Sequence, residues 1–272
     1  MNGGRRDGGG ADRAKADPAR AETAAKDVDA EDRPERDSGP QAQVVALAPA
    51  GRLTRQDGRG SAAVPRAPRG LATPDQVDSF RELRTRLLTM AEGVGLTHFA
   101  TLVVPVSSGS GASFVARNLA VAFTLQEQRV AILVDCNPRH PTQDAALGTR
   151  ADEGGLFDYI EQPRAPIQRL IRSTTIPGLH LIPAGRPAVM PREYFSSQPM
   201  RMVMAALRQA PCFPFLDGPP IKGSPDARIL SGLVDFVILV AGYGRDTPEA
   251  ISQAANLFEP TKFAGVVFNE RN

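Results

Sequence analysis

The chain has 272 residues with nearly balanced charges, 32 lysines and arginines against 30 aspartates and glutamates. Its formal net charge of +2 gives no electrostatic argument for binding nucleic acid or an anionic membrane surface. The two cysteines, Cys136 and Cys212, have neither metal-ligand nor redox spacing, so we expect reduced thiols in a cytoplasmic protein. The N-terminus lacks the apolar core of a signal peptide, and the apolar run at 236–242 is too short to cross a bilayer.

The first 72 residues are predicted to form a disordered N-terminal region. They are rich in Gly, Ala, Pro, Arg and Asp, mix both charges and contain no aromatic residue. Such a composition cannot bury enough apolar surface to offset the entropy lost on ordering. A short apolar patch at 44–48 is either a docking segment or, as we favour, a chance feature of a linker. Residues 73–272 are predicted to form one α/β domain.

A helix is predicted at 74–93, because Thr73 suits the N-cap and Pro74 the first helical position. Its apolar residues recur on one face, namely Val77, Phe80, Leu83, Leu87 and Leu88. On another side, Asp78, Arg81 and Arg84 recur at three-residue spacing. This charged row is either a solvated face with intrahelical ion pairs or an interaction surface, and spacing favours the former.

A strand, a glycine-bearing loop and a second helix follow. The apolar run 99–106 predicts a buried strand, and the spacing in 113–125 predicts a helix. The loop between them corresponds to the phosphate-binding pattern G-x-x-x-x-G-K-[ST], with Gly111 and Ser113 in place but Ala112 at the lysine position and Val106 at the first glycine. We therefore predict a nucleotide site that lacks its lysine, formed by Ser108, Gly109, Ser110, Gly111, Ala112, Ser113 and Phe114.

Two further predicted strands end in carboxylates. Strand 130–135 ends at Asp135 and strand 213–217 ends at Asp217. Open α/β sheets bind ligands at the carboxyl ends of their strands, next to such a loop. Together with Ser113, the two aspartates are oxygen ligands that magnesium accepts, and both are candidate catalytic residues if the protein is active. The alternative is that they cap helices or accept hydrogen bonds from loop amides.

Alternating strands and helices continue to the end of the chain. Helices are predicted at 155–161, 167–172, 199–208 and 248–258, and strands at 179–183, 234–241 and 263–268. This alternation predicts an α/β fold that is doubly wound and P-loop NTPase-like, with a mostly parallel sheet and helices on both faces.

The order of these motifs resembles the cytoplasmic domain of bacterial tyrosine kinases of capsule and exopolysaccharide synthesis, which are deviant-Walker P-loop ATPases. The resemblance covers about residues 74–270 and rests on six stretches: the Asp78/Arg81/Arg84 helix, 109–113, 135–139, 190–197, 216–220 with 225–227, and 268–269. It implies that Asp78, Arg81 and Arg84 contact a neighbouring subunit in a ring. It also implies that Arg139 and Asn269 belong to the nucleotide site.

Three departures from the family pattern bear on activity. Ala112 replaces the lysine that faces the transferred phosphoryl group, and Asn137 replaces the second aspartate of the D-x-D-x-R motif. The chain also has no C-terminal tyrosine cluster. Arg117, Arg139 and, less readily, Lys222 are the cations that could take the place of the lysine. Weak binding of ATP or ADP with Mg²⁺ is therefore expected, without fast turnover.

The resemblance implies a tyrosine-kinase-like pseudokinase that regulates exopolysaccharide or capsule polymerisation and export. It would act with an inner-membrane polysaccharide chain-length-determinant protein and lie at the membrane through that partner. We expect a homo-oligomer or a mixed ring, with no nucleic acid bound. The alternative is an active but slow ATPase or tyrosine autokinase of the same pathway. A partition-type ATPase of the same fold is less favoured, because the charge is near neutral and the kinase-like motifs are present.

Overall fold

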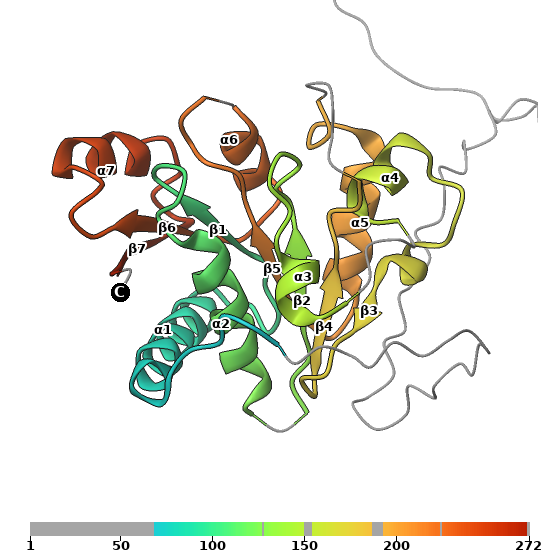
Figure 1. Cartoon of the computed structure of the whole chain (residues 1–272), viewed down its shortest axis with the longest axis horizontal. Coiled ribbons are helices and arrows are strands. Elements are labelled where there is room, and N and C mark those ends of the chain that lie inside the picture. The colour runs from blue at the N-terminus through green and yellow to red at the C-terminus, as the bar shows by residue number, and fades with distance from the viewer. Residues whose placement is uncertain (1–67, 127, 150–153, 187–192, 224, 271–272) are drawn as a thin grey trace, which may run out of the picture. The chain divides into compact units, whose positions relative to one another are not determined.

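The computed structural model describes residues 68–126, 128–149, 154–186, 193–223 and 225–270 (Figure 1). Most of the predicted disordered region, 1–67, lies outside these residues, as do positions 190–192 of the kinase-like stretch 190–197. The predicted domain boundary at residue 73 therefore stays a prediction. No helix among the described residues is long and apolar enough to span a bilayer.

A seven-stranded sheet forms the centre of the described residues, in the order β3-β4-β2-β5-β1-β6-β7. All neighbouring strands are parallel except β3 and β4, which are antiparallel. The strands are β1 (Thr101–Pro105), β2 (Ala131–Asp135), β3 (Arg172–Ser173), β4 (Leu179–Ile182), β5 (Phe213–Asp217), β6 (Phe236–Gly242) and β7 (Phe263–Asn269). The predicted doubly wound, mostly parallel architecture is confirmed.

Helices cover both faces of this sheet (Figure 1). They are α1 (Pro74–Gly93), α2 (Ala112–Thr124), α3 (Gln143–Leu147), α4 (Leu156–Glu161), the 3-10 helix η1 (Ile167–Leu170), α5 (Gln198–Gln209), α6 (Asp226–Ser231) and α7 (Pro248–Ala255). Residues of α1, α2 and α3 join one hydrophobic core, and residues of α4, α5, α6 and α7 join the other.

The central strands supply both cores because successive side chains of a strand point to opposite faces. In β1, Leu102 and Val104 join the core with α5, whereas Val103 joins the core with α2. All five residues of β1 are buried, as expected for a parallel sheet covered on both sides. The carboxyl ends of the parallel strands thereby lie on one side of the sheet, next to the candidate phosphate loop.

Most predicted elements are found within two residues of their predicted ends. Helix α1 has the predicted bounds, and the Gln76 side chain accepts a hydrogen bond of 3.1 Å from the Thr73 N–H at its start. The helix predicted at 167–172 is wrong at its end, because the chain becomes extended at Arg172 and pairs with β4 as strand β3. The short helices α3 and α6 were not predicted, since each spans too few residues to show a periodic pattern.

The chain just before α1 is held against the domain. The Arg69 N–H donates to the Ala146 carbonyl at 2.7 Å, and the Ala72 N–H donates to Asn118 Oδ1 at 2.6 Å. The Gly70 carbonyl accepts from Arg117 Nε at 3.2 Å and from Asn118 Nδ2 at 3.1 Å. All four bonds are made by residues 69–72, which the composition placed at the end of the predicted disordered region.

Candidate functional site

The loop between β1 and α2 requires glycine at two positions. Gly109 and Gly111 have φ angles of +86° and +89°, in the left-handed region that L side chains avoid. A Cβ at Gly109 would lie 2.2 Å from Arg245 Nη1, and a Cβ at Gly111 would lie 2.1 Å from Asn269 Nδ2. The Asn269 amide also donates to the Ser110 carbonyl at 3.1 Å. The loop therefore keeps a compact, glycine-dependent shape.

Asp246, in the turn after β6, anchors this loop. Its Oδ1 accepts a hydrogen bond of 2.5 Å from the Ser107 hydroxyl, and its Oδ2 accepts bonds of 2.7 Å from the Ser110 hydroxyl and from the Gly242 N–H. Partial burial acts to raise the pKa of Asp246, but these hydrogen bonds and the charge of Arg245 outweigh it, so the pKa is lowered. Ser110, predicted as a nucleotide contact, is thus buried and turned toward Asp246.

A cavity of about 700 Å³ opens beside the loop, at the carboxyl ends of the strands. The predicted site residues Ser108, Gly109, Gly111, Ala112, Ser113, Phe114 and Asn269 line it. The other walls come from the segment after β2, the segment after β5 and the start of α1, as Asn137, His140, Thr142, Gly218, Pro220, Leu71, Thr73 and Gln76, with Pro105 and Glu270. Residues predicted from separate motifs are therefore brought around one space.

No lysine or arginine is among the described residues that line this cavity. Arg139, predicted to belong to the nucleotide site, is exposed and does not line it, and the same holds for Lys222. Arg245 contacts the loop through the Ser108 carbonyl, which accepts from its Nη1 at 3.0 Å, but Arg245 is not part of the lining. An anion in the cavity would thus depend on backbone N–H groups and on the N-terminus of α2.

The backbone of the loop is suited to an anion. Within the described part of the chain, the N–H groups of Gly111, Ala112 and Ser113 donate no hydrogen bond. They stand at the N-terminus of a 13-residue helix, where a negative group is stabilised. The chemistry of the loop therefore fits the phosphates of a nucleotide, while the lining adds no positive side chain.

The two predicted carboxylates lie side by side but are buried. Asp135 and Asp217 are register partners at the ends of β2 and β5, with exposures of 0% and 1%, and neither lines the cavity. Asp135 accepts three backbone N–H groups, from Asn137 at 3.1 Å, Thr142 at 3.0 Å and Gln143 at 3.1 Å. Asp135 therefore accepts hydrogen bonds from loop amides, which is the alternative role that the sequence left open.

Burial raises the pKa of both carboxyls, and the neighbouring charge adds to this for Asp135. For Asp135, burial and then the Asp217 charge raise the pKa to about 7, against the effect of the three N–H groups. For Asp217, burial raises the pKa to about 6, although Gln143, Ser113 and the Arg117 charge act to lower it. The pair therefore holds a proton more readily than ordinary aspartates do, and its titration belongs to both groups together.

Gln143 and Arg117 connect these carboxylates to the loop helix. The Gln143 side chain donates from Nε2 to Asp217 Oδ2 at 2.7 Å and to the Ser113 carbonyl at 3.0 Å. Its Oε1 accepts from Arg117 Nη1 at 2.7 Å. Gln143 and Arg117 are 0% and 6% exposed, so this network is closed to solvent. Arg117, considered as a substitute for the missing lysine, is thus bound inside the protein.

A magnesium ion fits only part of the predicted ligand set. Asp217 Oδ1 is buried and accepts no hydrogen bond of standard geometry, although the Ser113 side chain is close enough to lower the Asp217 pKa. This oxygen and the Ser113 hydroxyl are therefore the two groups left for a cation. Both oxygens of Asp135 already accept N–H groups. The described residues contain no group of three or more His, Cys, Asp or Glu side chains arranged to hold a metal. Ser113 and Asp217 are therefore the residues that would hold Mg²⁺, mainly with oxygens of water and phosphate.

The charged row on α1 divides into an exposed and a buried part. Asp78 and Arg81 form an exposed ion pair of 3.0 Å. Arg84 is buried and donates from Nη1 to the Ala122 carbonyl of α2 at 2.7 Å. Of the three residues in this row, Asp78 and Arg81 are therefore accessible to another subunit and Arg84 is not. The ring interface stays a prediction.

Sequence reasoning missed Gln143 and Asp246 as site residues. Arg117 had a usable signal, since it follows Ser113 by four residues and so lies on the same face of α2. Gln143 comes from a short helix without periodicity, and Asp246 lies 136 residues after Ser110, so no spacing connects either one to the loop.

No family model matches the chain. Among curated proteins it is 28% identical over 210 residues to tyrosine-protein kinase wzc of Salmonella typhi, which covers 74% of this chain but only 27% of that protein. It is 24% identical over 172 residues to tyrosine-protein kinase CpsD of Streptococcus agalactiae, covering 62% of this chain and 73% of that protein. The chain thus spans about a quarter of the length of wzc.

Two solved structures have the same fold. The kinase domain of the Escherichia coli tyrosine kinase ETK matches with a TM-score of 0.63 at 18% identity, covering 77% of this chain and 84% of that domain. The septum site-determining protein MinD of Pyrococcus horikoshii, solved with Mg-ADP, matches with a TM-score of 0.51 at 19% identity, covering 63% and 69%. Taken with the ordered motifs and the cavity at the phosphate loop, these likenesses identify the chain as a homologue of the bacterial tyrosine-protein kinases, built on the P-loop ATPase fold.

Proposed function

We propose that this protein is a tyrosine-kinase-like pseudokinase that binds nucleotide weakly and does not turn it over. The observation that carries the proposal is the charge of the cavity. Its lining offers backbone N–H groups but, among the described residues, no lysine or arginine. Phosphoryl transfer depends on neutralising charge on the transferred group, so loss of that cation costs several kcal/mol of transition-state stabilisation, on the order of 3 or more.

The buried carboxylates support the same proposal. Asp135 is occupied by three N–H donors, and its pKa of about 7 leaves it partly protonated at neutral pH. Both of its oxygens already accept N–H groups, so a metal ion would have to share them with these donors. Asn137, which lines the cavity where the family pattern has a second aspartate, accepts a hydrogen bond but no proton.

The pathway is proposed from homology to kinases of capsule and exopolysaccharide synthesis. In this role the domain regulates polymerisation and export as the partner of an inner-membrane chain-length-determinant protein, whose cytoplasmic tail would bring it to the membrane. The exposed Asp78 and Arg81 on α1 are the residues available for assembly into a homo-oligomer or a mixed ring. The experiment for this part is co-purification with such a protein's tail, with Arg81→Ala as the variant expected to weaken assembly.

The decisive test of inactivity is to restore the lysine. We expect wild-type protein to show a thermal shift with ATP but no phosphate release above buffer. Ala112→Lys should bind ATP more tightly, because Ala112 lines the cavity. Ala112→Met serves as the control for side-chain bulk without charge. Wild-type turnover well above buffer that is lost in Asp217→Ala would contradict the proposal.

The second candidate is a slow ATPase or tyrosine autokinase. It is favoured by the Arg245 guanidinium, which lies on the loop at the Ser108 carbonyl, and by the free Oδ1 of Asp217. In this candidate, Arg245 would supply the positive charge that the absent lysine provides in the family pattern. This candidate predicts measurable turnover that falls at least tenfold in Arg245→Ala and is unchanged in Arg139→Ala. The pseudokinase proposal predicts no turnover in any of these proteins.

A further inference from the structure

Strand β7 forms one of the two edges of the described sheet. It follows β6 at the end of the strand order and has no neighbour on its other side among the described residues. An unpaired edge presents alternate N–H and C=O groups that can pair with another strand. Edge strands are commonly protected by lysine, proline or a bulge. The sequence Phe-Ala-Gly-Val-Val-Phe-Asn contains neither residue type, and its only irregularity lies at the start, opposite Val237 and Ile238.

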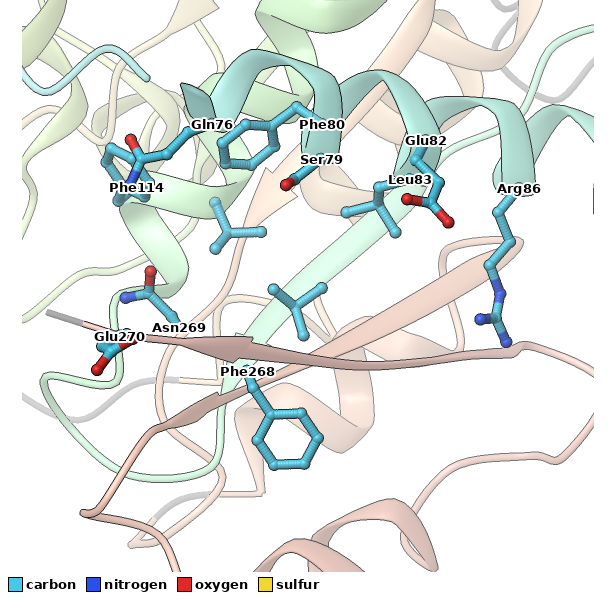
Figure 2. A pocket seen from close by; sticks show the side chains of 12 residues that line it. Gln76, Ser79, Phe80, Glu82, Leu83, Arg86, Phe114, Phe268, Asn269 and Glu270 are labelled. Atoms are coloured by element: carbon cyan, nitrogen blue, oxygen red, sulfur yellow. The ribbon is translucent and has the colours of Figure 1, made fainter. Parts of the chain in front are cut away.

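The regular part of this edge carries an exposed aromatic side chain. Phe268 is 64% exposed, so a strand paired with this edge would remove a large apolar side chain from water. It also borders two hollows, one with a mixed lining and one with a mostly apolar lining. One is a cavity of about 370 Å³ between α1 and β7, lined in part by Phe80, Leu83 and Phe114 (Figure 2). The other, about 620 Å³, lies against α7. The two hollows lie on opposite faces of the sheet and meet the strand edge at Phe268, and together they form the exposed surface of this edge.

Opposite charges stand at the two ends of this surface. Figure 2 shows Arg86 of α1 at one end of β7 and Glu270 at the other, with Phe268 between them. The Arg86 guanidinium lies 3.5 Å from where a Cβ on Gly265 would stand. Both charged side chains are exposed. An identical strand running the opposite way would therefore place its own Glu270 beside Arg86, and its Arg86 beside Glu270.

We propose that the open edge of β7 pairs antiparallel with β7 of a second copy, joining the two sheets across a twofold axis. A register centred on Val267 places Val266 of each copy opposite Phe268 of the other, so that these residues exchange backbone hydrogen bonds. Each Phe268 is covered by the partner strand. Two Arg86–Glu270 pairs close the ends of the interface. The surface is distinct from the exposed Asp78–Arg81 pair on which the ring prediction rests.

The test is sedimentation velocity of the full chain without nucleotide, over a wide concentration range. Wild-type protein should form a dimer, and Phe268→Glu should raise its dissociation constant at least tenfold. Val94→Glu is the matched control, because Val94 has an exposure of 65% at the end of α1, away from β7. It should leave the dimer unchanged. Circular dichroism of each variant checks that the fold is intact.

Charge exchange provides a second readout that does not alter the strand itself. Arg86→Glu and Glu270→Arg should each weaken the dimer, by about tenfold, because each puts like charges together at both ends of the interface. The double variant should restore wild-type affinity and salt sensitivity. A monomer at all concentrations would overturn the proposal. So would a dimer insensitive to Phe268→Glu or lost on Arg81→Ala, since it would use another surface. An apolar peptide binding β7 of a strictly monomeric chain would likewise overturn it, in favour of a different occupant.

Discussion

The polar groups on the two sides of the cavity beside the loop differ in whether they are available to a ligand. On one side, the loop from Ser107 to Gly111 keeps the left-handed glycines and free N–H groups of an anion site. On the other, Asp135 and Asp217 are withdrawn into a buried network with Gln143 and Arg117. The comparison shows that the loop backbone leaves N–H groups available to an anion, while the charged side chains beside it are bound to one another inside the fold.

The largest effect is expected at the cation of the buried network. Arg117→Met should lower the free energy of unfolding by about 3 kcal/mol, because it leaves two buried carboxylates without their counter-charge and Gln143 Oε1 without its donor. Urea denaturation at neutral pH measures this. Arg139→Met is the control at an exposed arginine, with an expected change within about 0.5 kcal/mol. If both variants lose the same stability, the claim that the buried network stabilises the fold is wrong.

The next effect concerns the loop. Asp246→Ala should cost about 2 kcal/mol, because two serine hydroxyls and the Gly242 N–H lose their acceptor. The lowered pKa of Asp246 means that its contribution is present at neutral pH and is lost on acidification below about pH 4. Glu249→Ala, at an exposed position in the first turn of α7, should change stability little. Asp246→Ala should also reduce the thermal shift that ATP produces. An unchanged shift would show that the loop keeps its shape without Asp246.

A smaller and opposite effect is expected at Asp217. The folded pKa values of about 7 for Asp135 and about 6 for Asp217 exceed the ordinary value of 3.8, so the folded protein holds protons that the unfolded chain releases. Stability must therefore fall as pH rises from about 4 to about 7 and then level off. Asp217→Asn should remove part of this fall and stabilise the protein by about 1 kcal/mol at pH about 8, measured by denaturation at several pH values.

Asp135→Asn is the matched comparison for that prediction. Asp135 accepts three N–H groups, and an amide NH₂ would face one of these donors, whereas Asp217 has an oxygen without a partner. The Asp135 variant should thus be destabilised at every pH. If both variants are stabilised alike, burial and not hydrogen bonding governs the pair.

The smallest effect is expected far from the cavity. Arg81→Ala removes an exposed ion pair with Asp78 on α1 and should change the free energy of unfolding by less than about 0.5 kcal/mol. This variant supplies the baseline for the others. A larger loss in the isolated domain would mean that the exposed face of α1 has a structural role within one copy.

The fold was predictable because its signals are local. The apolar run before Gly109 and the capped start at Thr73 and Pro74 define β1 and α1 from neighbouring residues. The site was predictable as far as it is made of loop backbone, since Gly111, Ser113 and Asn269 do line one cavity. What escaped prediction depends on contacts between distant residues. Asp246 meets Ser110 only once β6 lies beside β1, and Gln143 reaches Asp217 only through the turn after β2.

The hydrogen bond to the Gly70 carbonyl matters when the N-terminus of this protein is shortened. It is held by Arg117, 47 residues further along the chain, and the same arginine balances the two buried carboxylates. A version that begins at Thr73 would retain every helix and strand but lose this tether. The trimmed protein should consequently unfold more easily and titrate differently, so we expect the folded unit to begin no later than Arg69.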